Sequence, residues 1–422
     1  MGIFKRSLDS QNEKMNKITT RPKFKKKIKI KGPVLFLIGP IGTFFARLSK
    51  YLEKRNIKTY KISFPLFEYG FPRDRRIIFN KDIVHFKSFL HDILIEKEIK
   101  HILMYGNVLI PHRDALELID DLNKDGRDIQ SHIFELGYFR PNFVTLEEKG
   151  VNYKSGFILS KEFYNKQKPF KEFPLAIKQN LRLRKIWKAI TFINHSFQNY
   201  KIVDCEHKLQ PKPSYLWFQI KGFFLKYAYF FTEYKIKKDC FFKSNFFIVI
   251  LQVSSDSQLT KGSNIKNNYN FIESVIIDFY NSGLKDTKLV FKHHPRDRGY
   301  NNYLSFIRKL SKNFDLTGRV YYIHDYRLSK IFRNNKCKGT VLVNSTVGYQ
   351  SLFHSVPVKS LGKTPYNFDG LSDQRDLVCF FKNPQKVNNQ LFSKFYRYIM
   401  ENSQINGNFD GFFPFDELFK FD

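Results

Sequence analysis

Short apolar runs alternate with amphipathic stretches in the first part of this chain of 422 residues. Apolar runs of about five residues predict buried strands, and apolar positions repeated every three or four residues predict helices. The pattern predicts strands at 34–38, 59–64, 101–105 and 130–134, with helices at 43–55 and 111–122. Strands that alternate with helices favour a parallel sheet flanked by helices, so we expect a Rossmann-like domain.

The same alternation returns near the middle of the chain, after a section that lacks it. It predicts strands at 246–251, 288–292, 320–323, around Val341 and at 356–360, with helices at 272–282, 328–334 and 345–354. The fold class is therefore α/β, with two Rossmann-like domains that face each other across a cleft.

The domain organisation follows from these patterns and from shifts in composition. We expect a disordered basic tail at 1–31, an N-terminal Rossmann-like domain at 32–165, a helical linker rich in aromatic and basic residues at 166–245, a C-terminal Rossmann-like domain at 246–385 and a helical C-terminal segment at 386–422.

Charge narrows the possible partners. The chain has 72 Lys and Arg residues against 39 Asp and Glu residues, a formal net charge of +33. Such an excess fits nucleic acid, anionic lipid headgroups or phosphorylated substrates, and it also fits a compositional bias with a solvated basic face. The four cysteines lie far apart without a Cys-x-x-Cys pair, which indicates a reducing cytoplasm.

The linker contains the longest apolar stretch, at 215–231. Gln219, Lys221 and Lys226 interrupt it, whereas a membrane-spanning helix needs about 20 nearly uncharged residues. The N-terminus lacks the apolar core of a secretory signal. We therefore expect no spanning segment, but a peripheral membrane patch in which lysines accompany aromatic residues. The patch comprises Trp217, Phe218, Lys221, Phe223, Phe224, Lys226 and Phe230.

A phosphate site is predicted where an apolar strand leads into a helix. Asn344, Ser345 and Thr346 lie at this junction, where free backbone N–H groups and hydroxyls favour an anion. His294 and Pro295 end the preceding buried strand, and His294 could donate a hydrogen bond to a departing phosphate. The same residues also suit an ordinary helix N-cap or a structural histidine.

Glu135 ends another buried strand, with Arg140 five residues later. A carboxylate there is costly unless paired or used, so Glu135 is a candidate nucleophile or base, and Arg140 could neutralise an acidic sugar. A structural Glu-Arg ion pair is the alternative. Gly39 and Gly42, in the turn after the first strand, either let a ligand approach the backbone or form a structural turn.

Further polar groups follow other strands of the second domain. His324 and Asp325 could hold a ribose or a base, or could cap a helix. Gln252, Asp256 and Gln258 are expected to face the cleft. The sequence has no Gly-x-Ser-x-Gly elbow, His-Glu-x-x-His or Asp-x-Asp motif, which favours a transferase without a metal.

Taken together, several motifs resemble the capsule polysaccharide biosynthesis and export family that includes the KpsS and LipB proteins. The stretches that carry the resemblance are Gly39-Pro-Ile-Gly42, Tyr105-Gly-Asn107 with His112-Arg113, Glu135-x-Gly-Tyr-x-Arg-Pro141 with Thr145-Leu-Glu147, Leu251-Gln-Val-x-x-Asp-x-Gln258, Lys292-His-His-Pro295, His324-Asp325, and Val343-Asn-Ser-Thr-Val-Gly348 with Val356-Pro-Val-Lys359. The chain departs from the pattern at Asn107 and Leu136, where related Kdo transferases are expected to carry carboxylates.

The resemblance implies a retaining β-Kdo glycosyltransferase of the GT-B-like fold. The domain at 32–165 would bind the acceptor and carry out catalysis, and the domain at 246–385 would bind the nucleotide. It would transfer Kdo from CMP-Kdo to an anionic, phosphatidylglycerol-type lipid to start the linker of a bacterial capsule polysaccharide. Glu135 would lie in the catalytic centre, with His294, Ser345 and Thr346 around the CMP phosphate. No cofactor is implied beyond the donor substrate. The implied partners are the inner leaflet of the inner membrane, where the enzyme would be peripheral, and other capsule biosynthesis and export proteins.

Two other classes remain open from the sequence. A non-catalytic scaffold of the capsule export complex would keep the same motifs without performing the chemistry. A nucleic-acid-binding protein would use the excess of basic residues, but the chain shows no zinc-finger, RNP1-like or helix-turn-helix signal, so we expect no nucleic acid.

Overall fold

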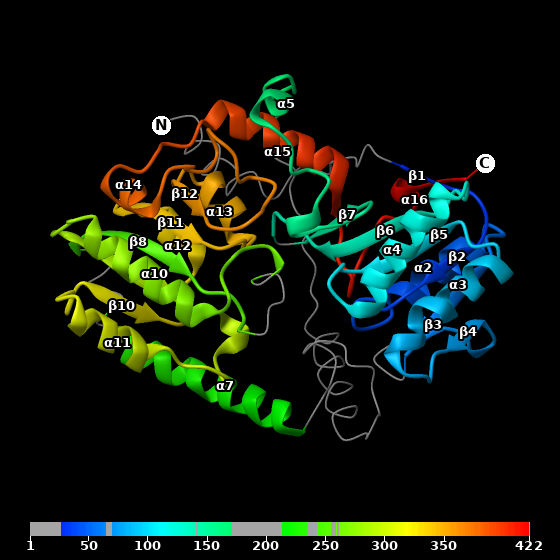
Figure 1. Cartoon of the computed structure of the whole chain (residues 1–422), viewed down its shortest axis with the longest axis horizontal. Helices are drawn as coiled ribbons and strands as arrows, with labels where there is room; N and C mark the ends of the chain where they lie inside the picture. The colour runs from blue at the N-terminus through cyan, green and yellow to red at the C-terminus, as the bar shows by residue number, and fades with distance from the viewer. Residues whose placement is uncertain are drawn as a thin grey trace.

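Two α/β lobes lie side by side in the structure (Figure 1). The computed structural model describes residues 27–421 except 65–69, 141, 171–212, 235, 237–242, 255–258 and 260, and only the backbone of 213–216. Each lobe has a mainly parallel sheet between helices, which confirms the predicted pair of Rossmann-like units.

The N-terminal lobe contains a seven-stranded sheet of order β13-β7-β6-β5-β2-β3-β4. The strands from β6 to β4 are parallel, whereas β7 runs antiparallel to both of its neighbours. The chain runs outward from β2 and then returns to β5, so the strand order reverses between β2 and β5. The strands are β2 Val34–Phe36, β3 Thr59–Ser63, β4 Arg76–Ile78, β5 His101–Tyr105, β6 Gln130–Leu136, β7 Phe143–Glu147 and β13 Gln404–Asn406.

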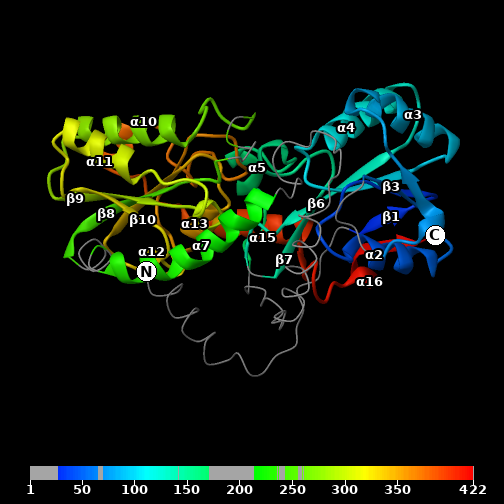
Figure 2. The same ribbon diagram turned by 90° about the horizontal axis from the view of Figure 1, so that it is seen from below.

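Helices cover both faces of this sheet (Figure 2). Leu35 and Leu37 pack with α3 and α4, whereas Val34 and Phe36 pack with α2, because successive side chains of a strand point to opposite faces. The helices of the lobe are α2 Phe44–Glu53, η1 Arg73–Arg75, η2 Ile83–His85, α3 Phe86–Glu96, α4 Ile110–Lys124 and η3 Asn152–Lys154. Helix α5 (Lys161–Asn165) follows them but packs on later parts of the chain, where Tyr164 stacks on Phe368.

The C-terminal lobe has a five-stranded, fully parallel sheet of order β10-β9-β8-β11-β12. Its strand order reverses between β8 and β11. Helices α10, α11 and α14 pack on one face, and α12 and α13 on the other. The elements are β8 Asn245–Ile250, α10 Asn268–Asn281, β9 Thr287–Lys292, η5 Pro295–Asp297, α11 Leu304–Asn313, β10 Val320–Ile323, α12 Leu328–Phe332, β11 Cys337–Leu342, α13 Val347–Phe353, β12 Val358–Ser360 and α14 Leu377–Lys382.

The C-terminal segment returns to the N-terminal lobe, which differs from the helical segment predicted for 386–422. Helix α15 (Asn389–Ser403) crosses between the lobes, and β13 then pairs with β7. Helix α16 (Phe415–Leu418) leads into β14 (Phe419–Phe421), which pairs with β1 (Ile28–Ile30). Residues 28–30 therefore belong to the fold, whereas the sequence assigned them to the basic tail.

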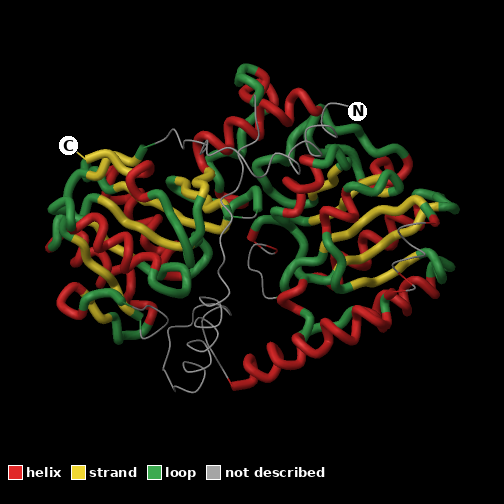
Figure 3. The backbone as a smooth tube through the Cα atoms, turned by 180° about the vertical axis from the view of Figure 1, so that it is seen from behind, coloured by secondary structure: helices red, strands yellow, loops and turns green. Residues whose placement is uncertain are grey.

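Helix α7 (Pro213–Thr232) is the longest described element of the predicted linker, and it lies along the outer edge of the C-terminal lobe (Figures 1 and 3). Among the helices within the described ranges, none is long and apolar enough to cross a membrane.

Candidate active site

The strand-order reversal of the C-terminal lobe places Gln252 beside Asn344. Gln252 follows β8 and Asn344 follows β11, and these strands are neighbours although 92 residues separate the two side chains. The Gln252 Nε2 donates to Asn344 Oδ1 at 2.8 Å, and the Asn344 backbone N–H donates to Gln252 Oε1 at 3.3 Å. This reciprocal pair holds together the two strand ends at which open α/β sheets bind ligands.

Ser345 and Thr346 follow Asn344 at the start of α13. The Ser345 Oγ accepts a hydrogen bond from the backbone N–H of Val347 at 3.2 Å. Thr346 occupies the N-cap position, but its side chain makes no capping hydrogen bond. Both residues are half-buried. The structure thus places Asn344, Ser345 and Thr346 together at one strand-to-helix junction, as the sequence predicted.

His294 follows β9 and is neutral at pH 7. Burial, aided by the nearby charges of Arg296 and Lys292, lowers its pKa to about 4. Its Nδ1 accepts a hydrogen bond from the Arg296 backbone N–H at 3.2 Å, so the ring proton is on Nε2. The ring can therefore donate from Nε2 without carrying a charge. Pro295, at the start of η5, is exposed.

Glu135 lies near the end of β6 and is half-buried. Its Oε1 accepts a hydrogen bond from the Leu136 backbone N–H at 2.9 Å. The Tyr105 hydroxyl, at the end of β5, also hydrogen bonds to this carboxylate. Burial raises the pKa of Tyr105 well above its usual value, and the negative charge of Glu135 adds a smaller contribution in the same direction. Two contacts thus fix the position of the Glu135 side chain.

Charged groups from the two lobes approach one another around Glu135. The positive charge of Arg296, from the C-terminal lobe, acts on Tyr105, which hydrogen bonds to Glu135. The exposed Arg140, from the N-terminal lobe, acts on both Glu135 and His294. Positive charge from both lobes therefore lies near the Glu135–Tyr105 pair, an arrangement that favours an anionic ligand.

Close packing at Gly39 and the backbone angle at Gly42 account for the two glycines of the turn after β2. A Cβ at Gly39 would come within 2.5 Å of the Phe45 ring, and Gly42 has a φ of +120°, which side chains rarely adopt. These constraints favour a structural turn. Contact between these glycines and a ligand stays a prediction.

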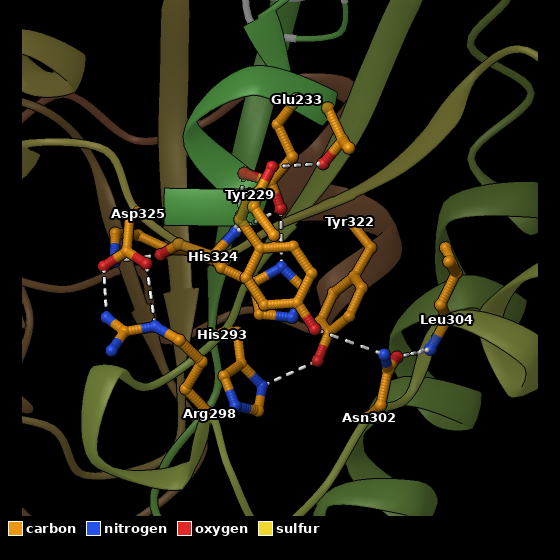
Figure 4. A network of polar contacts seen from close by, with 12 residues as sticks. Tyr229, Glu233, His293, Arg298, Asn302, Leu304, Tyr322, His324 and Asp325 are labelled. Atoms are coloured by element: carbon orange, nitrogen blue, oxygen red, sulfur yellow. Dashed lines mark hydrogen bonds and ion pairs between the residues drawn. The ribbon is translucent and has the colours of Figure 1, made fainter. Parts of the chain in front are cut away.

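His324 is held by a residue that the sequence did not single out. The Glu233 carboxylate accepts hydrogen bonds from the His324 backbone N–H at 3.1 Å and lies 2.5 Å from its Nδ1 (Figure 4). The ring of Tyr229, from α7, stacks on the imidazole with 3.6 Å between centroids. The sequence did contain a signal for this role, because Glu233 is the only acidic residue at 207–238. A single carboxylate among apolar residues is costly to bury unless it has a partner.

Asp325 also forms an ion pair within the protein. Arg298 donates from Nε and Nη2 to the two carboxylate oxygens, at 2.8 Å and 2.5 Å (Figure 4). The same arginine donates from Nη1 to the Gly222 carbonyl of α7 at 3.1 Å. His324 and Asp325 thus connect α7 to the end of β10, and their contact with a ribose or base remains a prediction.

Two of the remaining predicted site residues, Asp256 and Gln258, lie outside the described residues. At Asn107, the buried amide donates to the Val151 carbonyl at 3.4 Å. Within the described ranges, no three or more His, Cys, Asp or Glu side chains lie together in a group that could hold a metal ion.

The fold and these strand ends define a two-lobed α/β protein with converging polar groups, and sequence comparison identifies its family. Residues 107–410 match the family of capsule polysaccharide biosynthesis proteins, and the chain belongs to this family, as its motifs predicted. It is 31% identical over 406 residues to the capsule polysaccharide modification protein LipB of Neisseria meningitidis serogroup A, covering 90% of this chain and 93% of LipB.

Two further proteins are similar to this chain. The chain is 28% identical over 387 residues to the capsule polysaccharide export protein KpsS of Escherichia coli, covering 88% of this chain and 95% of KpsS. Among solved structures it is similar to Thermosulfurimonas dismutans KpsC, a β-Kdo 2,7 transferase, with a TM-score of 0.42, 14% identity, and coverage of 86% of this chain and 89% of that one.

Proposed function

We propose that the protein is a capsule glycosyltransferase that transfers Kdo from CMP-Kdo, with retention, to a phosphatidylglycerol-type lipid and so starts the poly-Kdo linker. Membership of the capsule polysaccharide biosynthesis family supports the pathway. The observation that carries the chemistry is Glu135, a positioned carboxylate with positive charge from both lobes nearby. Kdo and its activating phosphate are both anionic, and this site offers positive charge from both lobes.

The C-terminal lobe would bind the CMP part of the donor. His294 would donate from Nε2 to a phosphate oxygen and stabilise the charge that develops as CMP departs. Asn344, Ser345 and Thr346 would bind the same phosphate from the junction before α13. Arg140 would pair with the sugar carboxylate. The proposal needs no metal and no cofactor beyond the donor substrate.

Retention would result from two displacements at the anomeric carbon. In the first, a Glu135 carboxylate oxygen forms a bond to this carbon while the bond to the phosphate oxygen breaks, and CMP takes the electron pair. In the second, a hydroxyl of the acceptor lipid attacks the same carbon, releases Glu135 and loses its proton to a base. Two inversions restore the original configuration, as in retaining glycosidases.

The acceptor also suggests where the enzyme works. A phosphatidylglycerol-type lipid is available at the inner leaflet of the inner membrane, so we place the protein on the cytoplasmic side as a peripheral protein. There it would work with other capsule biosynthesis and export proteins.

The test is product formation by the purified full chain. CMP-Kdo is incubated with a phosphatidylglycerol-type lipid, and mass spectrometry and NMR follow the lipid product and CMP. We expect a lipid with the added mass of Kdo, the β configuration at the new bond and equimolar CMP. A scaffold without catalytic activity would release no CMP and form no product, which would refute the proposal.

A further inference from the structure

Helix α7 presents a continuous aromatic surface to solvent on the outside of the C-terminal lobe. The side-chain exposure of Trp217, Phe224 and Phe231 is 65%, 67% and 74%. Large apolar side chains are seldom this exposed in a contiguous group unless the group binds something. The aromatic stripe consists of Trp217, Ile220, Phe223, Phe224, Tyr227, Phe230 and Phe231.

The opposite face of α7 is attached to the lobe, so the stripe cannot turn inward. Phe218 packs on Tyr300 with 4.7 Å between ring centroids, and it is half-buried rather than part of the predicted membrane patch. A Cβ at Gly299 would lie 2.0 Å from the Phe218 carbonyl, so only glycine lets the helix approach this closely. The Glu233 contact with His324 anchors the end of the helix.

Two lysines flank the stripe. At about 100° per residue, the stripe covers an arc of roughly 140° around the helix, and Lys221 and Lys226 lie about 40° beyond its two edges. Both lysines are exposed, and α7 contains no Asp or Glu. Lysines in these positions can extend beside a buried apolar face and keep their charged ends among lipid phosphates.

We infer that α7 is a docking helix that lies flat on an anionic bilayer, with the aromatic stripe at the acyl boundary and Lys221 and Lys226 at the headgroups. An exposed apolar face flanked by basic residues favours a membrane interface. The net charge of +33 favours an anionic surface over a neutral one. Because its inner face holds His324 and Arg298, a docked α7 sets the orientation of the C-terminal lobe on the lipid.

This inference deepens the membrane location under the proposed function, but its test measures lipid binding without sugar transfer. Either proposal can therefore fail while the other stands. The full chain is floated with phosphatidylcholine vesicles, with and without phosphatidylglycerol. We expect flotation with the anionic vesicles only, weakened by salt.

Matched variants distinguish the effect of the stripe and its two lysines on vesicle binding from the effect of net charge. We expect Lys221→Glu/Lys226→Glu, and separately Trp217→Ser/Phe224→Ser/Phe231→Ser, to weaken vesicle binding by roughly tenfold or more. The control Lys309→Glu/Lys312→Glu makes the same change in net charge on α11, at exposed residues, and should leave most of the binding. Equal losses in the α7 and α11 charge variants would overturn the inference.

Trp217 provides a second readout. The chain has two tryptophans, so Trp187→Phe leaves Trp217 as the single reporter. We expect its emission to shift to shorter wavelength on anionic vesicles and to be quenched by brominated lipid. An unchanged spectrum on bound vesicles would overturn the inference, as would stripe variants that bind anionic vesicles as well as the wild type does.

Discussion

The rings of Tyr138 and Tyr349 stack across the two lobes, with 5.0 Å between centroids and an interplanar angle of 10°. Tyr138 follows Glu135 by three residues, and Tyr349 follows Thr346 by three. The stack therefore ties the segment directly after β6, the strand that carries the candidate nucleophile, to the helix at the predicted phosphate site. Both rings are almost fully buried, so the contact holds the halves of the candidate site in a fixed relation.

The two hydroxyls of this stack should have opposite effects on stability. Tyr138 donates to Glu147 Oε1 at 2.6 Å and accepts from the Asn152 N–H at 2.9 Å, whereas the buried Tyr349 hydroxyl has no partner among the described residues. We expect Tyr138→Phe to destabilise the protein by about 1–3 kcal/mol, and Tyr349→Phe to stabilise it by about 1 kcal/mol. Urea unfolding measures both, and equal destabilisation would contradict the assignment.

Glu147 should make stability depend on pH. Burial raises its pKa from 4.5 to about 7, although Ser155, Tyr138 and Ser403 donate hydrogen bonds to it. A carboxyl with a raised pKa in the folded state contributes stability that is complete below pH 4.5 and is lost as the pH rises through about 7. The loss is on the order of 3 kcal/mol.

The variant Glu147→Gln should remove this pH dependence, whatever its effect on absolute stability. Chemical unfolding at several pH values measures the slope. The exposed neighbour provides the control, because Glu148→Gln should retain the wild-type slope. A slope that survives in Glu147→Gln would show that another group titrates.

Removing the Glu135 carboxylate should separate chemistry from donor binding. We expect Glu135→Gln to abolish transfer while CMP binds nearly as in the wild type, because the predicted CMP contacts lie in the other lobe. Calorimetry with CMP and product formation measure the two effects. Intact-protein mass spectrometry should also detect a Kdo adduct at residue 135 in the wild type alone, and wild-type turnover by the variant would exclude the role.

The neutral Nε2–H of His294 should matter as a hydrogen-bond donor rather than as a charge. We expect His294→Ala to lower kcat by a factor on the order of 10² to 10³, the usual cost of losing such a donor. His294→Gln keeps an N–H in the region and should lose less. Because the pKa of His294 is about 4, the wild-type rate should show no titration of this ring near neutral pH. A titration near pH 6.5 that disappears in His294→Gln would contradict this prediction.

Local pattern was enough to predict most strands of both parallel sheets. The predicted strands at 101–105 and 320–323 have the bounds of β5 and β10. It was also enough to place Glu135, His294 and Asn344 near strand ends. The prediction worked because buried parallel strands are short apolar runs, and ligand groups in such sheets follow their carboxyl ends.

The two antiparallel strands of the N-terminal sheet, β7 and β13, were not predicted from the sequence. Strand β13 joins β7 after the chain has left the N-terminal lobe and crossed back through α15. Three residues carry too little periodicity to predict such a partner, since pairing depends on which edge is available in the folded sheet.

The amino-acid sequence by itself determined the α/β class, the family and the residue types available at each strand end, since these depend on local order along the chain. Only the tertiary structure decided that Glu233 holds His324 and that Tyr138 stacks on Tyr349. It also decided which face of α7 is left to solvent. These contacts join residues far apart in the chain, and burial selects them only once both lobes have packed.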